Sequence, residues 1–147
     1  MFRHWVLGVA LAGTGWQALA ADEAGTVKTV RGTVTLEREG KGLPAAPGQK
    51  VQVSDRIVTG ADSSAGLVLR DGSILTAGAN SVLQLDKFAF NPTTYAGQMD
   101  VNLKKGKLSV ISGKIDKTDP EAVRFRSSGV TLGVRGTEFV IETTGEQ

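Results

Sequence analysis

The sequence predicts an all-β protein: a single small domain of short strands and hairpins, arranged as a sandwich or a solenoid. Apolar and polar residues alternate from about residue 26 onward, as in strands with one buried face. Turn signals recur about every 8 to 12 residues, the spacing of small all-β folds. No stretch keeps the i, i+3, i+4, i+7 apolar pattern of an amphipathic helix, so a long helix is not expected. The length of 147 residues suits one domain.

The expected strands follow in order, each rich in β-branched or aliphatic residues. They cover residues 30–36, 51–54, 57–58, 67–70, 82–85, 101–103, 108–111, 123–126 and 130–141, and the pattern also resumes at Ile74. Asp71-Gly72 predicts a hairpin, because this pair favours a type I′ turn in which both central residues have positive φ. Gly106 is expected in a second hairpin turn. Residues 39–48 and 88–97, with their Gly and Pro, are expected to be loops.

The first 20 residues have the layout of a secretory signal peptide. Arg3 and His4 form the charged start, an apolar stretch follows, and Ala18-Leu19-Ala20 fits an A-x-A cleavage site. The apolar stretch is shorter than the ~20 residues that span a bilayer, which disfavours an uncleaved anchor. We therefore expect cleavage after Ala20. The mature domain, residues 21–147, is expected in the bacterial periplasm without stable membrane insertion.

Composition excludes several function classes. The chain has no Cys, and its one His is His4, inside the leader. The mature chain therefore lacks the residues for His-based acid–base catalysis, for serine–histidine dyads and for most transition-metal sites. The net charge of +2 is small and the charges are interspersed, which argues against a nucleic-acid partner. We expect no enzyme activity, no metal and no cofactor.

Three segments, in order, resemble the periplasmic domain of the FecR family. Residues 48–60, GQKVQVSDRIVTG, resemble a turn-and-strand unit of the family, with Ser54 where the family usually has Gly. Residues 65–81, AGLVLRDGSILTAGANS, are similar to its strand, Asp-Gly-Ser turn and next strand. Residues 133–139, GVRGTEF, resemble its most recognisable signature. The resemblance spans about residues 26–141.

The resemblance implies a periplasmic module that binds another envelope protein, in signalling or assembly. Well-understood family members regulate iron uptake through a cytoplasmic segment that controls a sigma factor, followed by a membrane helix. With a leader at Met1 we expect neither here, so the anti-sigma function is not carried over. The alternative is a carbohydrate- or peptidoglycan-binding module. The loss of Trp5 and Trp16 with the leader counts against it, although Tyr95 remains.

The family motifs supply the candidate site residues, as structural or partner-binding positions. They are Asp55, Asp71, Gly72, Gly133, Val134, Arg135, Gly136, Thr137 and Phe139. Arg135 suits a partner's carboxylate, but an internal pair with Asp55 or Asp71 is favoured, because glycines around a charge usually serve packing. The spacing of the Asp residues at 55, 62, 71 and 86 matches no calcium loop, so turn-forming roles are expected. Gly72→Val is expected to destabilise the fold by about 1 kcal/mol or more.

Residues 130–141 are expected to form one final strand. Because the chain ends soon after Ile141, this strand is expected at an edge of the sheet, whether that end is natural or truncated. Arg135 and Glu138 are its only central charges and it contains no Pro, so the usual protection of an edge is thin. We expect it to form part of the partner-binding surface by strand addition. The alternative is that the strand near Val30 covers it.

Overall fold

The computed structural model describes residues 23–127, 130–132 and 138–143. This part of the chain holds twelve strands, a short helix α1 (Lys114–Thr118) and a 3-10 turn η1 (Pro120–Ala122). The strands are β1 (Glu23–Arg31), β2 (Val34–Arg38), β3 (Lys41–Pro44), β4 (Lys50–Gln52), β5 (Arg56–Thr59), β6 (Ser64–Leu69), β7 (Ile74–Ala77), β8 (Val82–Phe90), β9 (Gly97–Ile111), β10 (Val123–Ser127), β11 (Val130–Leu132) and β12 (Glu138–Thr143). The all-β, single-domain prediction is confirmed. No helix in these ranges is long and apolar enough to cross a bilayer.

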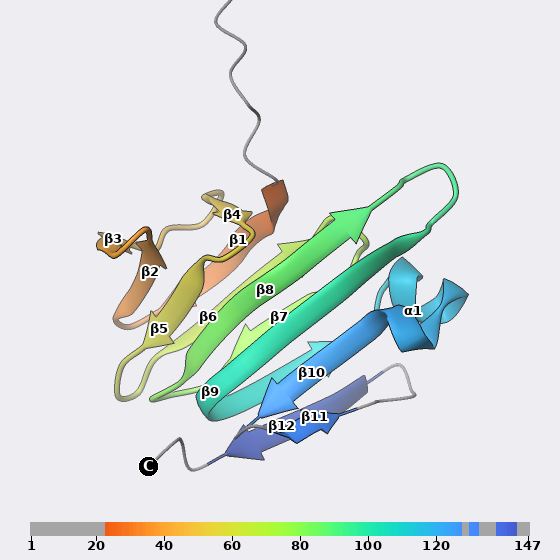
Figure 1. Ribbon diagram of the computed structural model, residues 1–147. Helices are drawn as coiled ribbons and strands as arrows, with labels where there is room; N and C mark the ends of the chain where they lie inside the picture. The colour runs from red at the N-terminus through yellow and green to blue at the C-terminus, as the bar shows by residue number, and fades with distance from the viewer. Residues whose placement is uncertain (1–22, 128–129, 133–137, 144–147) are drawn as a thin grey trace, which may run out of the picture.

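The strands form one continuous sheet that curls into a half-barrel (Figure 1). Its order is β3-β2-β5-β8-β9-β7-β6-β1-β4, with β10 and β12 also paired to β9, and β11 to β10. The first half of β9 pairs with β8 and β10, and the second half pairs with β7 and β12. Strand β9 therefore joins the two layers of the curled sheet. All pairings are antiparallel except that of β9 with β10.

One hydrophobic core lies inside the curl. The period-two pattern turns alternate side chains inward, so Leu83 and Leu85 of β8 are buried while Gln84 between them is partly exposed. Both layers contribute, for example Val101 from the first half of β9 and Leu108 from the second. Full burial of such a side chain stabilises the fold by roughly 1.5–3 kcal/mol. The core therefore holds the two layers together.

Gly106 is not in a hairpin turn, so that prediction is wrong. It lies within β9, with φ of 94°, where the strand passes from one layer to the other. The register with β8 shifts beside it, between the pairs made by Val82 and Leu83, as in a β-bulge. Ser81 packs directly against Gly106, and its Oγ accepts a hydrogen bond from the N–H of Lys107 at 3.0 Å. Gly106 therefore serves a bend inside one strand and not a turn between two strands.

The Asp71-Gly72 hairpin is confirmed, joining β6 to β7, but its turn differs from the expected type. Gly72 has φ of 87°, whereas Asp71 is not among the residues with positive φ. The N–H of Gly72 donates to the carbonyl of Leu69 at 2.9 Å, so Arg70 and Asp71 are the central residues. Gly72 follows them as the left-handed residue of a three-residue loop. A type I′ turn is therefore ruled out.

Three further boundaries differ from expectation. Residues 39–48 contain the exposed strand β3, which pairs with β2. The predicted loop at 88–97 shrinks to the exposed residues 91–96, because β8 continues to Phe90 and β9 starts at Gly97. Residues 130–141 do not form one strand: β11 pairs with β10 and β12 pairs with β9, on different layers. Local alternation cannot reveal such a break.

Candidate functional site

The GVRGTEF segment lies mostly outside the described residues. Gly133, Val134, Arg135, Gly136 and Thr137 are among the residues not described. Phe139 is described: it is half-buried in β12, and its ring packs edge-to-face on Phe125, with centroids 5.0 Å apart. This contact joins β12 to β10 across the two layers. The visible role of Phe139 is therefore packing.

Asp55 is a buried structural anchor, with 1% of its surface exposed. Arg38 donates to both of its oxygens, from Nε at 2.9 Å and from Nη2 at 2.7 Å. The N–H of Gln52 also donates to Oδ2, at 2.8 Å. This hydrogen bonding with Asp55 raises the pKa of Arg38. The pair ties β2 to the turn before β5, while a pairing with Arg135 stays a prediction.

Asp71 is equally buried and organises its own turn. Its Oδ1 accepts from the N–H of Ser73 at 3.0 Å, and its Oδ2 accepts from the Ser73 hydroxyl at 2.8 Å. Its backbone carbonyl accepts from the N–H of Lys114, and Ser73 Oγ accepts from the N–H of Gly113. The Asp-Gly-Ser turn thus docks on the start of α1. The expected turn-forming role of Asp71 is confirmed.

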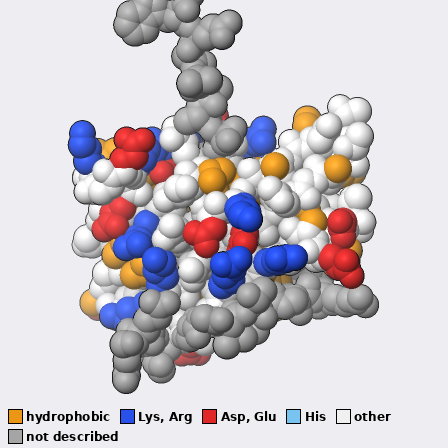
Figure 2. Space-filling view, viewed as in Figure 1, with side chains coloured by type: hydrophobic (Ala, Val, Ile, Leu, Met, Phe, Trp, Pro, Cys, Tyr) orange, Lys and Arg blue, Asp and Glu red, His pale blue; other side chains and the backbone are white. Residues whose placement is uncertain are grey.

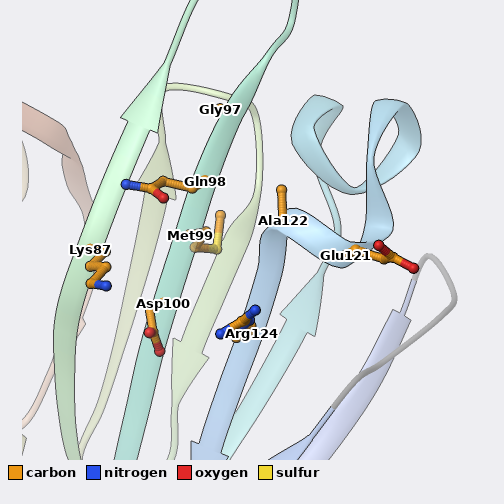
Figure 3. A pocket seen from close by; sticks show the side chains of 8 residues that line it. All are labelled: Lys87, Gly97, Gln98, Met99, Asp100, Glu121, Ala122 and Arg124. Atoms are coloured by element: carbon orange, nitrogen blue, oxygen red, sulfur yellow. The ribbon is translucent and has the colours of Figure 1, made fainter.

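A hollow of about 250 Å³ lies over β8, β9, η1 and the start of β10 (Figure 3). Its lining residues are Lys87, Gly97, Gln98, Met99, Asp100, Glu121, Ala122 and Arg124. Strand pairing brings the charged side chains of the hollow together, since Lys87 on β8 and Arg124 on β10 are both in register with Asp100 on β9. Figure 2 shows charges of both signs on this face of the molecule. The sequence alone does not reveal this charged group, because Lys87, Asp100 and Arg124 come from three different strands.

Asp100 is the buried centre of this charged group, with a side chain that is 7% exposed. Its Oδ2 accepts from Arg126 at 3.1 Å, and its Oδ1 has no hydrogen-bond partner among the described residues. The pKa of Asp86 is raised, mainly by burial and then by the charge of Asp100. The positive charges of Arg126 and of two lysines oppose this rise. Asp86 lies in β8, so its expected turn role is wrong.

Within the described ranges no group of three or more acidic or His side chains is placed to hold a metal.

Strand β12 has one side that pairs with no described strand. Among the described strands it pairs only with β9, from Glu138 opposite Ile111 to Thr143 opposite Gly106. Val140, which is 56% exposed, lies on its outer face, and Ile111, which is 41% exposed, lies diagonally across on β9. Strand β1 pairs with β4 and β6 instead, so the alternative that it covers β12 is wrong.

Comparison with known protein families gives a match. The family model described as FecR protein matches residues 55–147, which is more than half of the chain. The matched range begins at the buried Asp55 and includes the Asp-Gly-Ser turn, the hollow and β12. No curated protein and no solved structure matches. Strands β1 to β4 precede the matched range but belong to the same sheet.

Proposed function

The chain belongs to the FecR family, and on that premise we propose that it is an exported, non-catalytic module that binds another protein in the periplasm. Domains of this family are generally signalling or binding domains. The leader with its Ala18-Leu19-Ala20 site supports export. The observation that supports protein binding best is the open side of β12 with exposed Val140 beside it. An unpaired strand edge next to apolar side chains suits the addition of a strand from a partner.

A comparison with the other edges of the sheet supports this choice. Strand β3 ends at Pro44 and begins at Lys41, and both residue types hinder edge-to-edge pairing. Strands β4 and β11 have three residues each, too few for a long ladder of hydrogen bonds. Strand β12 has six residues and contains neither Lys nor Pro. It is therefore the described edge best suited to a partner.

A carbohydrate-binding module is the second candidate, because Tyr95 is 42% exposed in the loop at 91–96. An exposed aromatic ring can stack on a sugar. The ring already stacks on Phe90, with centroids 6.2 Å apart, and Lys114 Nζ lies 4.7 Å from its centroid. These two contacts occupy ring surface that a sugar would need, so protein binding remains our proposal.

Site-specific photo-crosslinking in intact cells tests the proposal. A photoreactive amino acid at Val140 is expected to give a discrete adduct with another protein of the periplasmic fraction. The matched control is Leu43 on β3, which is apolar and 46% exposed. Equal adducts at both positions, or none at Val140, would contradict the proposal. Sedimentation with purified peptidoglycan, with and without Tyr95→Ala, tests the carbohydrate alternative.

A further inference from the structure

This inference rests on the proposed function. We infer that β12 accepts a partner strand whose alternate side chains are basic, apolar and basic. We also infer that β12 rejects a second copy of itself. Both inferences start from the three side chains that β12 places on its outer face. These are Glu138, Val140 and Glu142, and all three are exposed.

Two glutamates, Glu138 and Glu142, flank Val140 on this outer face. Neither Glu138 nor Glu142 forms an ion pair within the described residues. On the β9 side, Glu138 faces Ile111, which carries no charge. Glu142 faces Lys107, but the two form no ion pair. A cation on an added strand can therefore approach each carboxylate from the open side, where opposite-charge pairs across strands are stabilising.

The position between the glutamates calls for an apolar partner residue. Val140 is the most exposed of the large hydrophobic residues described. A residue directly opposite it on an added strand would have its Cβ about 4.5–5.5 Å away, close enough to cover it. Ile111 enlarges the same apolar surface on the β9 side. An apolar residue at this position removes Val140 from water, whereas a charged residue would lose hydration there.

The same pattern works against pairing between two copies. An antiparallel pair centred on Val140 pairs residues 138–142 of the two copies and places Glu138 of each copy opposite Glu142 of the other. Like charges directly opposite each other destabilise a sheet. A parallel pair in register brings each glutamate beside its own counterpart. The two glutamates therefore keep an otherwise open edge from joining itself, while leaving it open to a basic strand.

Peptide binding to the mature protein tests this inference. The probes are fluorescent Thr-Lys-Thr-Val-Thr-Lys-Thr and its counterpart with Glu in place of both Lys, titrated by anisotropy at low salt. From the usual strength of cross-strand charge pairs, the Lys peptide is expected to bind about 2- to 30-fold more tightly than a neutral Gln counterpart. The Glu peptide is expected to bind more weakly than the Gln peptide. At equal peptide concentration, amide exchange of β12 is expected to slow most with the Lys peptide.

Charge reversal supplies the control. The double variant Glu138→Lys, Glu142→Lys is expected to prefer the Glu peptide, while Glu39→Lys, in the turn between β2 and β3, keeps the original preference. Equal binding of all three peptides, absence of binding, or a dimer in sedimentation that Val140→Lys dissociates would overturn the inference. A discrete Val140 adduct together with failed peptide binding would leave protein binding standing and remove only the strand chemistry. Failure of the adduct would remove the proposed function itself.

Discussion

Replacing Gly106 by Ala tests the bend that carries β9 from one layer to the other. Gly106 has φ of 94°, which costs an L-residue about 1–2 kcal/mol. An added Cβ would also lie 2.6 Å from the Cα of Ser81, closer than real Cβ contacts. Because the backbone at Ser81 would have to move, overpacking adds about 1–3 kcal/mol to the loss in the free energy of unfolding. The expected loss in the free energy of unfolding is therefore about 2–5 kcal/mol, a large part of the ~5–15 kcal/mol typical of a domain.

Gly72→Ala is the matched control. Gly72 has a similar φ of 87°, but no atom lies within 4 Å of an added Cβ. Its substitution should cost only the conformational part, about 1–2 kcal/mol. The difference between the two losses in the free energy of unfolding isolates the contribution of the close contact between Ser81 and residue 106.

Urea unfolding followed by far-ultraviolet circular dichroism measures both variants, with the slope m checked for two-state behaviour. We expect the midpoint to fall further for Gly106→Ala than for Gly72→Ala at unchanged m. If the two midpoints coincide, or if Gly72→Ala falls further, the packing of Ser81 does not fix this bend.

Three other predictions concern charge and export. Arg38→Ala should cost about 3–5 kcal/mol, because the buried Asp55 carboxylate loses its cation and keeps only the hydrogen bond from Gln52. Arg56→Ala, in the exposed pair with Glu37, should cost about 0–1 kcal/mol, and equal losses in urea unfolding would contradict this. Because the folded state raises the pKa of Asp86, stability should fall as pH rises from the usual Asp pKa through the raised one, and Asp86→Asn should lessen that fall in unfolding measured across this range. Intact mass of the periplasmic fraction should give a chain starting at Ala21, and a chain retaining Met1 in the membrane fraction would reject cleavage.

Strand positions were predictable because burial repeats every second residue. Leu67 and Leu69, and likewise Leu83 and Leu85, alternate with more exposed neighbours in the structure as in the pattern. The hairpin at Asp71-Gly72 was predictable for a local reason too, since Asp and Gly suit a turn in any fold. Its turn type was not, because the docking of Ser73 on Gly113 is a contact between segments distant in sequence.

The candidate site was less predictable, because its geometry comes from strand pairing. Asp100 meets Arg126 across 26 residues, and Asp55 meets Arg38 across 17. No spacing rule links such residues before the register is known. Gly106 shows the reverse difficulty: a strong local signal for a turn was overridden by the approach of Ser81.

The central position of β9 also bears on when the protein can fold. Strands β1 to β8 are synthesised first, yet β7 and β8 are neighbours in the sheet only through β9, which begins at Gly97. The earlier two-thirds of the chain therefore cannot close the core on its own. Pairings this distant in sequence also make folding slow. If the protein is exported as proposed, this order would keep the nascent chain from closing its core until β9 has been synthesised.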